Sequence, residues 1–222
     1  DPNRTFVEAA KAYDDNQLAD AIAGWQSLLD AGHIQPAVLY NLGNAHFRAG
    51  HLGQAIRAYR HAQTLAPRDP DIRANLTFAA QTAGITLPHR PPPLALLHNA
   101  SRAEWRALAH AAYWILALLL AARLLLPRQR TILRPAIILA LLLLLLSLAG
   151  LTAHHRLQHR PELVVIPPGQ TLLSAPLPTA TPLLDLPQGA IVRQRGQRDT
   201  WLEIQYQSTR GWLPATATAP TR

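Results

Sequence analysis

Imidazole and carboxylate side chains could supply metal ligands or general acids and bases. The chain has 10 histidines, and the densest cluster is His154, His155 and His159, in which the last two would share one helix face. Only the distant Glu162 could add a carboxylate. In the repeat region Asp14, Asp15, Asp20 and Asp30 fall at expected turns and helix ends, and no glycine-rich phosphate loop follows a strand. We therefore expect no catalytic, metal or cofactor site, and the chain is not predicted to be an enzyme.

A second set of side chains suits binding rather than catalysis. Aromatic rings alternate with an amide and a guanidinium, so that rings would supply contact area and Asn would bond a peptide backbone. The candidate binding residues are Phe6, Tyr13, Tyr40, Asn44, Phe47, Arg48 and Phe78. Packing within the domain is an equally good interpretation for Tyr13 and Phe47.

These residues are carried by a sequence repeat with a period of 34. Matched positions include Pro2/Pro36/Pro70, Tyr13/Phe47, Trp25/Tyr59, Asn41/Asn75, Leu42/Leu76 and Gly50/Gly84. The pattern resembles the tetratricopeptide repeat, which is a pair of antiparallel helices. It predicts an α-solenoid domain over residues 1–86 with two and a half repeats, the third having only its first helix.

The resemblance implies a concave groove lined by the first helix of each repeat, which would hold the candidate binding residues. In the subtype that captures a free C-terminal carboxylate, basic and amide residues line the groove. Here Phe6, Ala10, Ala74 and Phe78 fill those slots and only Asn41 remains, so carboxylate capture is not expected. The last helix would have an open apolar side, and we expect it to dock on a partner protein or near a membrane surface.

Two long apolar segments follow a proline-rich linker over residues 87–100. The first, 101–126, begins with the capping-box pattern Ser101-Arg102-Ala103-Glu104 and the interfacial residue Trp105. The second, 135–153, has 19 residues without a charge, enough for about 28 Å of helix. We expect a two-helix transmembrane hairpin in a lipid bilayer.

The charge distribution supports a membrane and argues against nucleic acid. The chain has a net charge of +8, and residues 89–160 alone account for a net +8. A nucleic-acid binder needs a basic face on a folded domain instead. The arginines of loop 127–134 indicate a cytoplasmic loop, with both termini outside the cytoplasm of a bacterial inner membrane. The chain has no Met, and we expect that a segment preceding Asp1 was removed; a signal peptide is one interpretation, and the sequence leaves its nature open.

After a second linker at 154–160, short β-rich segments separated by Pro and Gly predict an all-β domain over 161–216, followed by a flexible tail at 217–222. The segments 186–192, 201–204 and 210–214 resemble the strands of the bacterial SH3-like barrel. Trp201, Tyr206 and Trp212 are its candidate ligand face. A place for the two tryptophans in the barrel core is the more common alternative.

The order of these parts resembles the E-type proteins of the bacterial aerotolerance (Bat) system. The segments Tyr40–Ala45, Gly53–Ile56, Asp69–Leu76 and Glu104-Trp105 agree with that family. The resemblance implies a non-catalytic subunit that works with von Willebrand factor A-domain membrane proteins and, indirectly, a MoxR-type AAA+ ATPase.

Two functions from different classes follow. In the first, the protein is a membrane-anchored scaffold that binds partners through the repeat groove and the membrane helices. In the alternative, the protein is a cell-wall-binding anchor: the SH3-like domain binds the cell wall, and the repeats recruit another protein.

Overall fold

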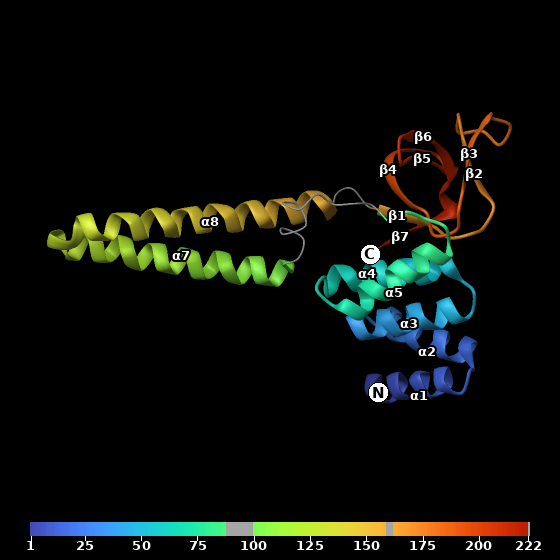
Figure 1. Ribbon diagram of the computed structural model, residues 1–222, viewed down its shortest axis with the longest axis horizontal. Helices are drawn as coiled ribbons and strands as arrows, with labels where there is room; N and C mark the ends of the chain where they lie inside the picture. Colours follow the sequence, from blue (N-terminus) through green and yellow to red (C-terminus); the bar gives the residue numbers. More distant parts are fainter. Residues whose placement is uncertain (88–99, 159–161, 222) are drawn as a thin grey trace. The chain divides into compact units, whose positions relative to one another are not determined.

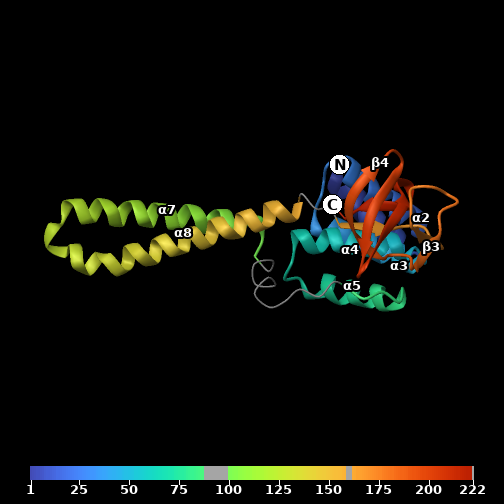
Figure 2. The ribbon, with the colours of Figure 1, turned by 90° about the horizontal axis from the view of Figure 1, so that it is seen from above.

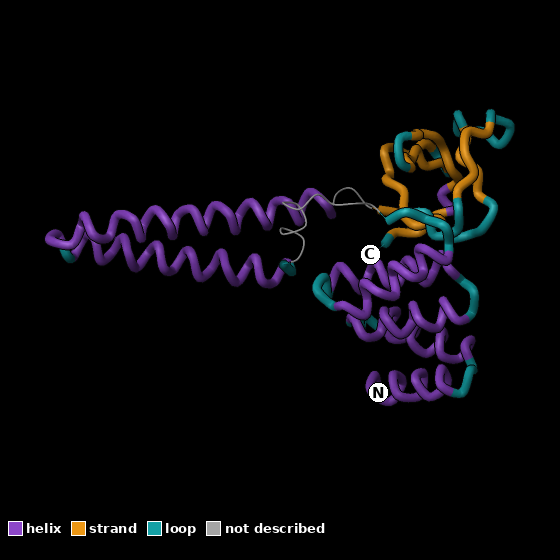
Figure 3. The backbone as a smooth tube through the Cα atoms, viewed as in Figure 1, coloured by secondary structure: helices purple, strands orange, loops and turns teal. Residues whose placement is uncertain are grey.

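The computed structural model describes residues 1–87, 100–158 and 162–221. The chain divides into two compact units, and the first is discontinuous in sequence: it combines Asp1–His89 with Arg160–Arg222. The second unit is Arg90–His159. Figure 1 labels the elements along the chain, and Figure 3 separates the helices of the first unit from its strands.

The N-terminal part of the first unit is an array of antiparallel helices. They are α1 (Pro2–Asp14), α2 (Leu18–Asp30), α3 (Pro36–Arg48), α4 (Leu52–Leu65) and α5 (Pro70–Thr82). A proline begins α1, α3 and α5, where its missing N–H costs no hydrogen bond. The helices α3 and α5 end alike, because Gly50 and Gly84 follow with φ values of 77° and 67°. The helix boundaries therefore repeat at the period that the sequence predicts.

Small residues let these helices approach closely. A Cβ atom added at Gly43 on α3 would lie 2.6 Å from the Tyr59 ring on α4. Trp25 of α2 fills the corresponding place in the first repeat and is buried with Ala9 and Ala21. The large aromatic residue of each second helix thus packs over a small residue of the first helix.

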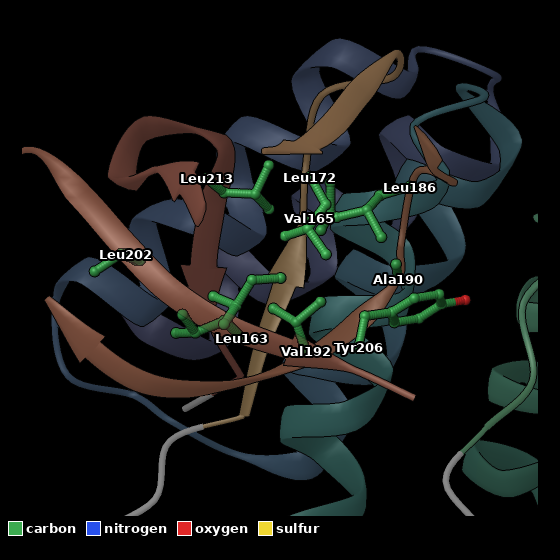
Figure 4. Packing of buried hydrophobic residues seen from close by; sticks show 10 residues of the cluster. Leu163, Val165, Leu172, Leu186, Ala190, Val192, Leu202, Tyr206 and Leu213 are labelled. Atoms are coloured by element: carbon green, nitrogen blue, oxygen red, sulfur yellow. The ribbon is translucent and has the colours of Figure 1, made fainter. Parts of the chain in front are cut away.

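The C-terminal part of the first unit is an antiparallel sheet. Its strands are β1 (Glu162–Val165), β2 (Gln170–Leu173), β3 (Pro182–Leu186), β4 (Ile191–Arg198), β5 (Trp201–Tyr206), β6 (Thr209–Pro214) and β7 (Thr218–Pro220). The strand order is β3-β2-β6-β5-β4-β1-β7. Leu163, Val165, Leu172, Val192 and Leu213 turn toward one another in the core (Figure 4).

The sequence pattern predicts no strand where β3 lies, and it predicts a flexible tail where β7 lies. The edge strand β3 is exposed except for Leu186 and begins at a proline, so it lacks the alternation of a half-buried strand. A flexible tail was expected over 217–222, but Thr218–Pro220 pairs with β1 as β7, and Thr221 is buried. The backbone N–H of Thr221 also donates to the Glu162 carbonyl at 3.1 Å.

The apolar end of the helical array is covered by the chain itself. The sequence predicts that α5 has an apolar side open to a partner or a membrane, but Leu76 on this helix is buried. Ile72 is buried as well, in a cluster with Leu39 and Ala62 of the second repeat. Leu76 shares a cluster with Val164 of strand β1. The prediction of an open end is wrong because Leu76 and Val164, nearly ninety positions apart, are buried in the same cluster. The repeat pattern of the sequence does not indicate that they come together.

The second unit is a helical hairpin of α7 (Arg102–Leu125) and α8 (Arg130–Gln158), joined by a 3-10 turn at Pro127–Gln129. Figure 2 shows the two helices side by side. The capping box forms as predicted: Ser101 N–H donates to the Glu104 carboxylate at 2.7 Å, and Glu104 N–H donates to Ser101 Oγ. Helix α8 begins five residues before the predicted span, continues through Pro135 and ends at Gln158. Most of the expected loop 127–134 and the described part of the expected linker 154–160 are therefore helical.

The hairpin packs through small residues and exposes large apolar ones. Ala112, Ala140 and Ser147 are buried, and a Cβ added at Gly150 would lie 2.5 Å from the Trp105 ring. The helical stretches Ala103–Leu125 and Arg130–Ala153 are long and apolar enough to cross a membrane. Their exposed side chains include Trp114, Leu118, Leu124, Ile132, Ile138, Leu139, Leu142 and Leu145. This exposure is unlike that of the core helix of a water-soluble domain.

Candidate functional site

A hollow of about 210 Å³ lies among the first helices of the repeats. We call it the α1–α3–α5 site, since these helices supply all but one of its residues. It is lined by Tyr13, Asn44, Phe47, Arg48, Tyr59, Asn75 and Phe78. Five of the seven candidate binding residues from the sequence meet in it.

A network of neutral side chains forms the floor of the site. Asn44 Oδ1 accepts hydrogen bonds from the Tyr59 hydroxyl at 2.7 Å and from Asn75 Nδ2 at 2.9 Å. Asn75 Nδ2 also donates to the Tyr40 hydroxyl at 3.1 Å. Burial raises the pKa of the Tyr59 phenol, so this group stays a protonated donor at physiological pH.

The same network leaves two polar atoms without a partner. Within the described residues, neither Asn44 Nδ2 nor Asn75 Oδ1 makes a hydrogen bond. One is a donor and the other an acceptor, which are the two groups that a peptide unit needs. The floor is thus suited to bond the C=O and N–H of an extended chain.

The walls of the site are aromatic. The rings of Phe47 and Phe78 lie with their centroids 5.4 Å apart at a tilt of 48°. Phe78 is 59% exposed although it is a large apolar residue. The hydrophobic effect would favour covering it with an apolar side chain of a ligand.

The charged side chain of the site, Arg48, bonds residues at and just after the C-terminal end of α1. The Arg48 guanidinium lies 4.4 Å from the centre of the Tyr13 ring. It donates to the Tyr13 carbonyl at 3.0 Å and to Asn16 Oδ1 at 2.8 Å. Since these partners fix its orientation, the charge is presented in one position at the rim.

The two remaining candidates from the sequence lie outside the lining. Phe6 packs with its ring centroid 6.4 Å from that of Trp25, in the core of the first repeat. Tyr40 lies beside Tyr59 and supports the floor through Asn75. Tyr13 combines both interpretations, because it lines the site and also packs against Trp25.

Sequence reasoning missed Tyr59 and Asn75. Asn75 is the counterpart of Asn41 at the repeat period, and it lies one turn before Phe78 on the same helix. That spacing could have placed it in the site. Tyr59 belongs to a second helix and reaches the site only because Gly43 leaves room for its ring.

A second hollow of about 150 Å³ lies among α2, α3 and α4. It contains His46, whose pKa burial lowers to about 4, with smaller contributions from His51 and Arg57. His46 is therefore neutral at physiological pH.

The sheet residues of the candidate ligand face do not share one side. Leu202, Ile204 and Tyr206, every second residue of β5, belong to the core of the sheet, and Tyr206 is 8% exposed. Figure 4 shows Tyr206 beside Val192 of β4. Trp201 and Trp212 lie half-buried on the opposite face, Trp212 across from Glu203 in β5. The two tryptophans are thus outside the core, and Tyr206 is part of it.

No metal site is evident where side chains are described, since no three His, Asp or Glu residues come together there. The side chains of His154 and His155 and the whole of His159 lie outside the described residues.

Comparison with known proteins bears on the helical part. Residues 36–69 match the tetratricopeptide repeat family. The match covers α3, α4 and the turn before α5, so that α1–α2 and α5 extend a recognised repeat on both sides. No curated protein matches the chain. Tetratricopeptide repeats are typically non-catalytic interaction domains, and this region accordingly indicates a role in protein interaction.

Proposed function

We propose that the protein is a non-catalytic membrane-anchored adaptor that binds an extended segment of a partner protein in the α1–α3–α5 site. One observation carries this proposal. A donor, Asn44 Nδ2, and an acceptor, Asn75 Oδ1, both lack a hydrogen-bond partner among the described residues. The same hollow is lined by the aromatic residues Phe47 and Phe78 and by Arg48, whose guanidinium is held by Tyr13 and Asn16. A peptide supplies the matching groups, namely a backbone amide and an apolar side chain.

The occupant is expected to be an internal segment rather than a free C-terminus. Among the described lining residues Arg48 alone is a cation, and two of its five N–H donors already bond Tyr13 and Asn16. The remaining lining residues are neutral, so a terminal carboxylate would gain little here.

Membrane anchoring by the α7–α8 hairpin is part of the proposal. It is supported by the large apolar side chains that the hairpin exposes and by the arginines at its turn. The basic turn favours a cytoplasmic loop, which would leave the repeat and the sheet outside the cytoplasm of a bacterial inner membrane.

The domain order also supports a proposal about the partner proteins. The order of repeats, hairpin and SH3-like sheet favours a place in a Bat-type assembly. Its von Willebrand factor A-domain membrane proteins would be the direct partners, and a MoxR-type AAA+ ATPase would act indirectly.

A photo-crosslinking experiment tests the binding proposal. A photoreactive phenylalanine analogue replaces Phe78 in the full chain, in its own membrane, and adducts are identified by mass spectrometry. The control position is Val7, which is exposed on α1 outside the site. We expect a defined adduct at position 78 that disappears with Asn44→Ala and Asn75→Ala. The same adducts from both positions would contradict the proposal.

Single cysteines test the membrane orientation, because the chain has no native cysteine. Ala23→Cys and Ser208→Cys place thiols in the repeat and the sheet, and Gln129→Cys places one at the turn of the hairpin; all three positions are exposed. An impermeant maleimide added to intact spheroplasts should label the first two, and Gln129→Cys only after lysis. Labelling of just one of the first two would exclude a two-pass arrangement.

The cell-wall alternative draws on Trp201 and Trp212, which share the outer face of the sheet. Co-sedimentation of the detergent-solubilised full chain with purified cell wall, lost with Trp201→Ala, would favour it. Absence of co-sedimentation would leave the adaptor function.

A further inference from the structure

The second repeat and the C-terminal sheet share one apolar cluster. It consists of Ala55, Ile56, Tyr59, Leu76, Ala79, Ala80, Ile85 and Val164, with Ile166 and Ile191 packed against it. Val164 has no exposed surface and Leu76 is 1% exposed. Without the sheet, the side of this cluster that faces Val164 would be exposed to water, because the end of a solenoid has no neighbouring repeat to bury it.

Strand β1 contributes to two cores at once. Leu163 and Val165 belong to the core of the sheet, whereas Val164 belongs to the cluster with the repeat. Successive side chains of a strand point to opposite faces, so β1 lies between the two layers. All three residues are buried, which explains why this short strand is apolar without alternation.

The backbones of the two parts meet at glycines. A Cβ atom added at Gly53 on α4 would lie 2.8 Å from the Ile166 carbonyl oxygen and 3.0 Å from that of Val165. A Cβ at Gly189, in the turn before β4, would collide with the Ile56 side chain. Only residues without a side chain allow this approach.

Polar groups fix the register of the contact. Arg60 on α4 forms an ion pair with Glu162 of β1, and their side chains are only 9% and 22% exposed. Arg57, one turn earlier, donates from Nε to the Pro220 carbonyl of β7 at 2.8 Å. Because the pair is largely removed from water, loss of either charge would leave the other poorly solvated.

We propose that the C-terminal sheet is the cap of the helical repeat, taking the place that the second helix of a third repeat would fill. Strand β1 contacts α4, and its residue Val164 belongs to the apolar cluster that includes residues of α5. The second helix of a third repeat would pack against the same two helices. The hairpin is then an insertion into a single folded body. Residues 1–87 and 162–221 must occupy the same compartment, and the α4 face that the sheet covers is closed to partners.

The decisive variant is Gly53→Ala, studied by hydrogen exchange of the full chain in detergent micelles. In a helix that faced only solvent, this change would slow exchange, since alanine favours the helix. Against the backbone of β1, the added methyl group instead forces α4 and β1 apart. Hydrogen exchange in α5 and β1 should therefore accelerate on the order of tenfold. Exchange in α1 and α7 should not change.

The matched control is Gly196→Ala in the sheet. Its added Cβ would lie 3.0 Å from Glu203 Oε2, which can move aside, and at an ordinary contact distance of 3.6 Å from Glu203 Cβ. We expect no effect on α5 from this variant. Unchanged or slower exchange of α5 in Gly53→Ala would overturn the proposal, and so would equal acceleration in both variants.

The ion pair gives an independent measurement. Arg60→Glu and Glu162→Arg should each accelerate exchange in both α4 and β1, and the double exchange of charges should restore part of the protection. If each single variant affects only its own element, the sheet is not the cap. These readouts do not depend on any ligand, so they separate this proposal from the proposed function.

Discussion

Replacement of Tyr59 by phenylalanine tests the network beneath the α1–α3–α5 site. Tyr59 is 2% exposed, and its hydroxyl donates to Asn44 Oδ1 at 2.7 Å. Phenylalanine keeps the ring that packs over Gly43 and removes only the hydroxyl. The change therefore isolates one hydrogen bond without creating a large cavity.

The expected magnitude follows from what Asn44 retains. Its Oδ1 still accepts from Asn75 Nδ2 at 2.9 Å, so no buried acceptor is left unsatisfied. The loss is that of one neutral hydrogen bond, about 1 kcal/mol, or about fivefold faster exchange of the amides in α3 and α4. Tyr40→Phe should have a smaller effect, because Asn75 Nδ2 keeps its bond to Asn44.

Tyr59 should also make the folding stability of the repeat depend on pH in the alkaline range. Burial raises the pKa of the Tyr59 phenol above its ordinary value of 10.0, so the folded chain holds a proton that the unfolded chain releases. The contribution of Tyr59 to folding stability is then constant below about pH 10 and falls as the pH rises further. Tyr59→Phe should remove this part of the alkaline loss.

Two measurements check these expectations. Hydrogen exchange of the full chain in micelles near neutral pH gives the opening free energies of α3 and α4. Alkaline titration of the helical circular dichroism signal gives the pH dependence. Exchange and alkaline unfolding identical to those of the parent chain would refute the hydrogen-bond assignment.

Three further variants probe neighbouring positions. Gly43→Ala should destabilise the repeat by about 1–3 kcal/mol, seen as faster exchange in α3, because its Cβ would lie 2.6 Å from the Tyr59 ring. In the parent chain, stability should fall as the pH drops from 6.5 toward 4, since the unfolded chain binds a proton that buried His46 excludes. His46→Gln should remove that dependence, which amounts to on the order of 2 kcal/mol after allowance for solvent screening, and acid titration of the circular dichroism signal measures it. Phe78→Ser should leave exchange unchanged within about 0.5 kcal/mol, because Phe78 is 59% exposed. It should nevertheless abolish adducts from a photoreactive group at position 47, and persistence of those adducts would argue against the site.

The elements that local rules specify could be predicted accurately. Pro36 begins α3, Gly50 follows its end, and Ser101 caps α7 as the sequence indicates. Proline at a helix start, glycine after its end and a capping box act through neighbouring backbone groups. The errors fall where local preference is weak, as in the exposed edge strand β3 and the three-residue strand β7.

The candidate site could be predicted only in part. The repeat period places Asn44, Phe47 and Phe78 on first helices, and these residues do meet. Tyr59 and Asn75 complete the floor through hydrogen bonds to a residue 15 and 31 positions away. Which side chains exchange such bonds depends on how the helices cross, and a single sequence does not report that.

The sequence by itself determined the repeat, the two apolar helices and most of the strands, because periodicity and propensity act over a few residues. Only the tertiary structure decided what covers the end of the repeat. The ion pair between Arg60 and Glu162 joins residues 102 positions apart, with the whole hairpin between them. Val164 and Leu76 are buried in one cluster because two surfaces fit together, and the sequence pattern of neither surface identifies its partner.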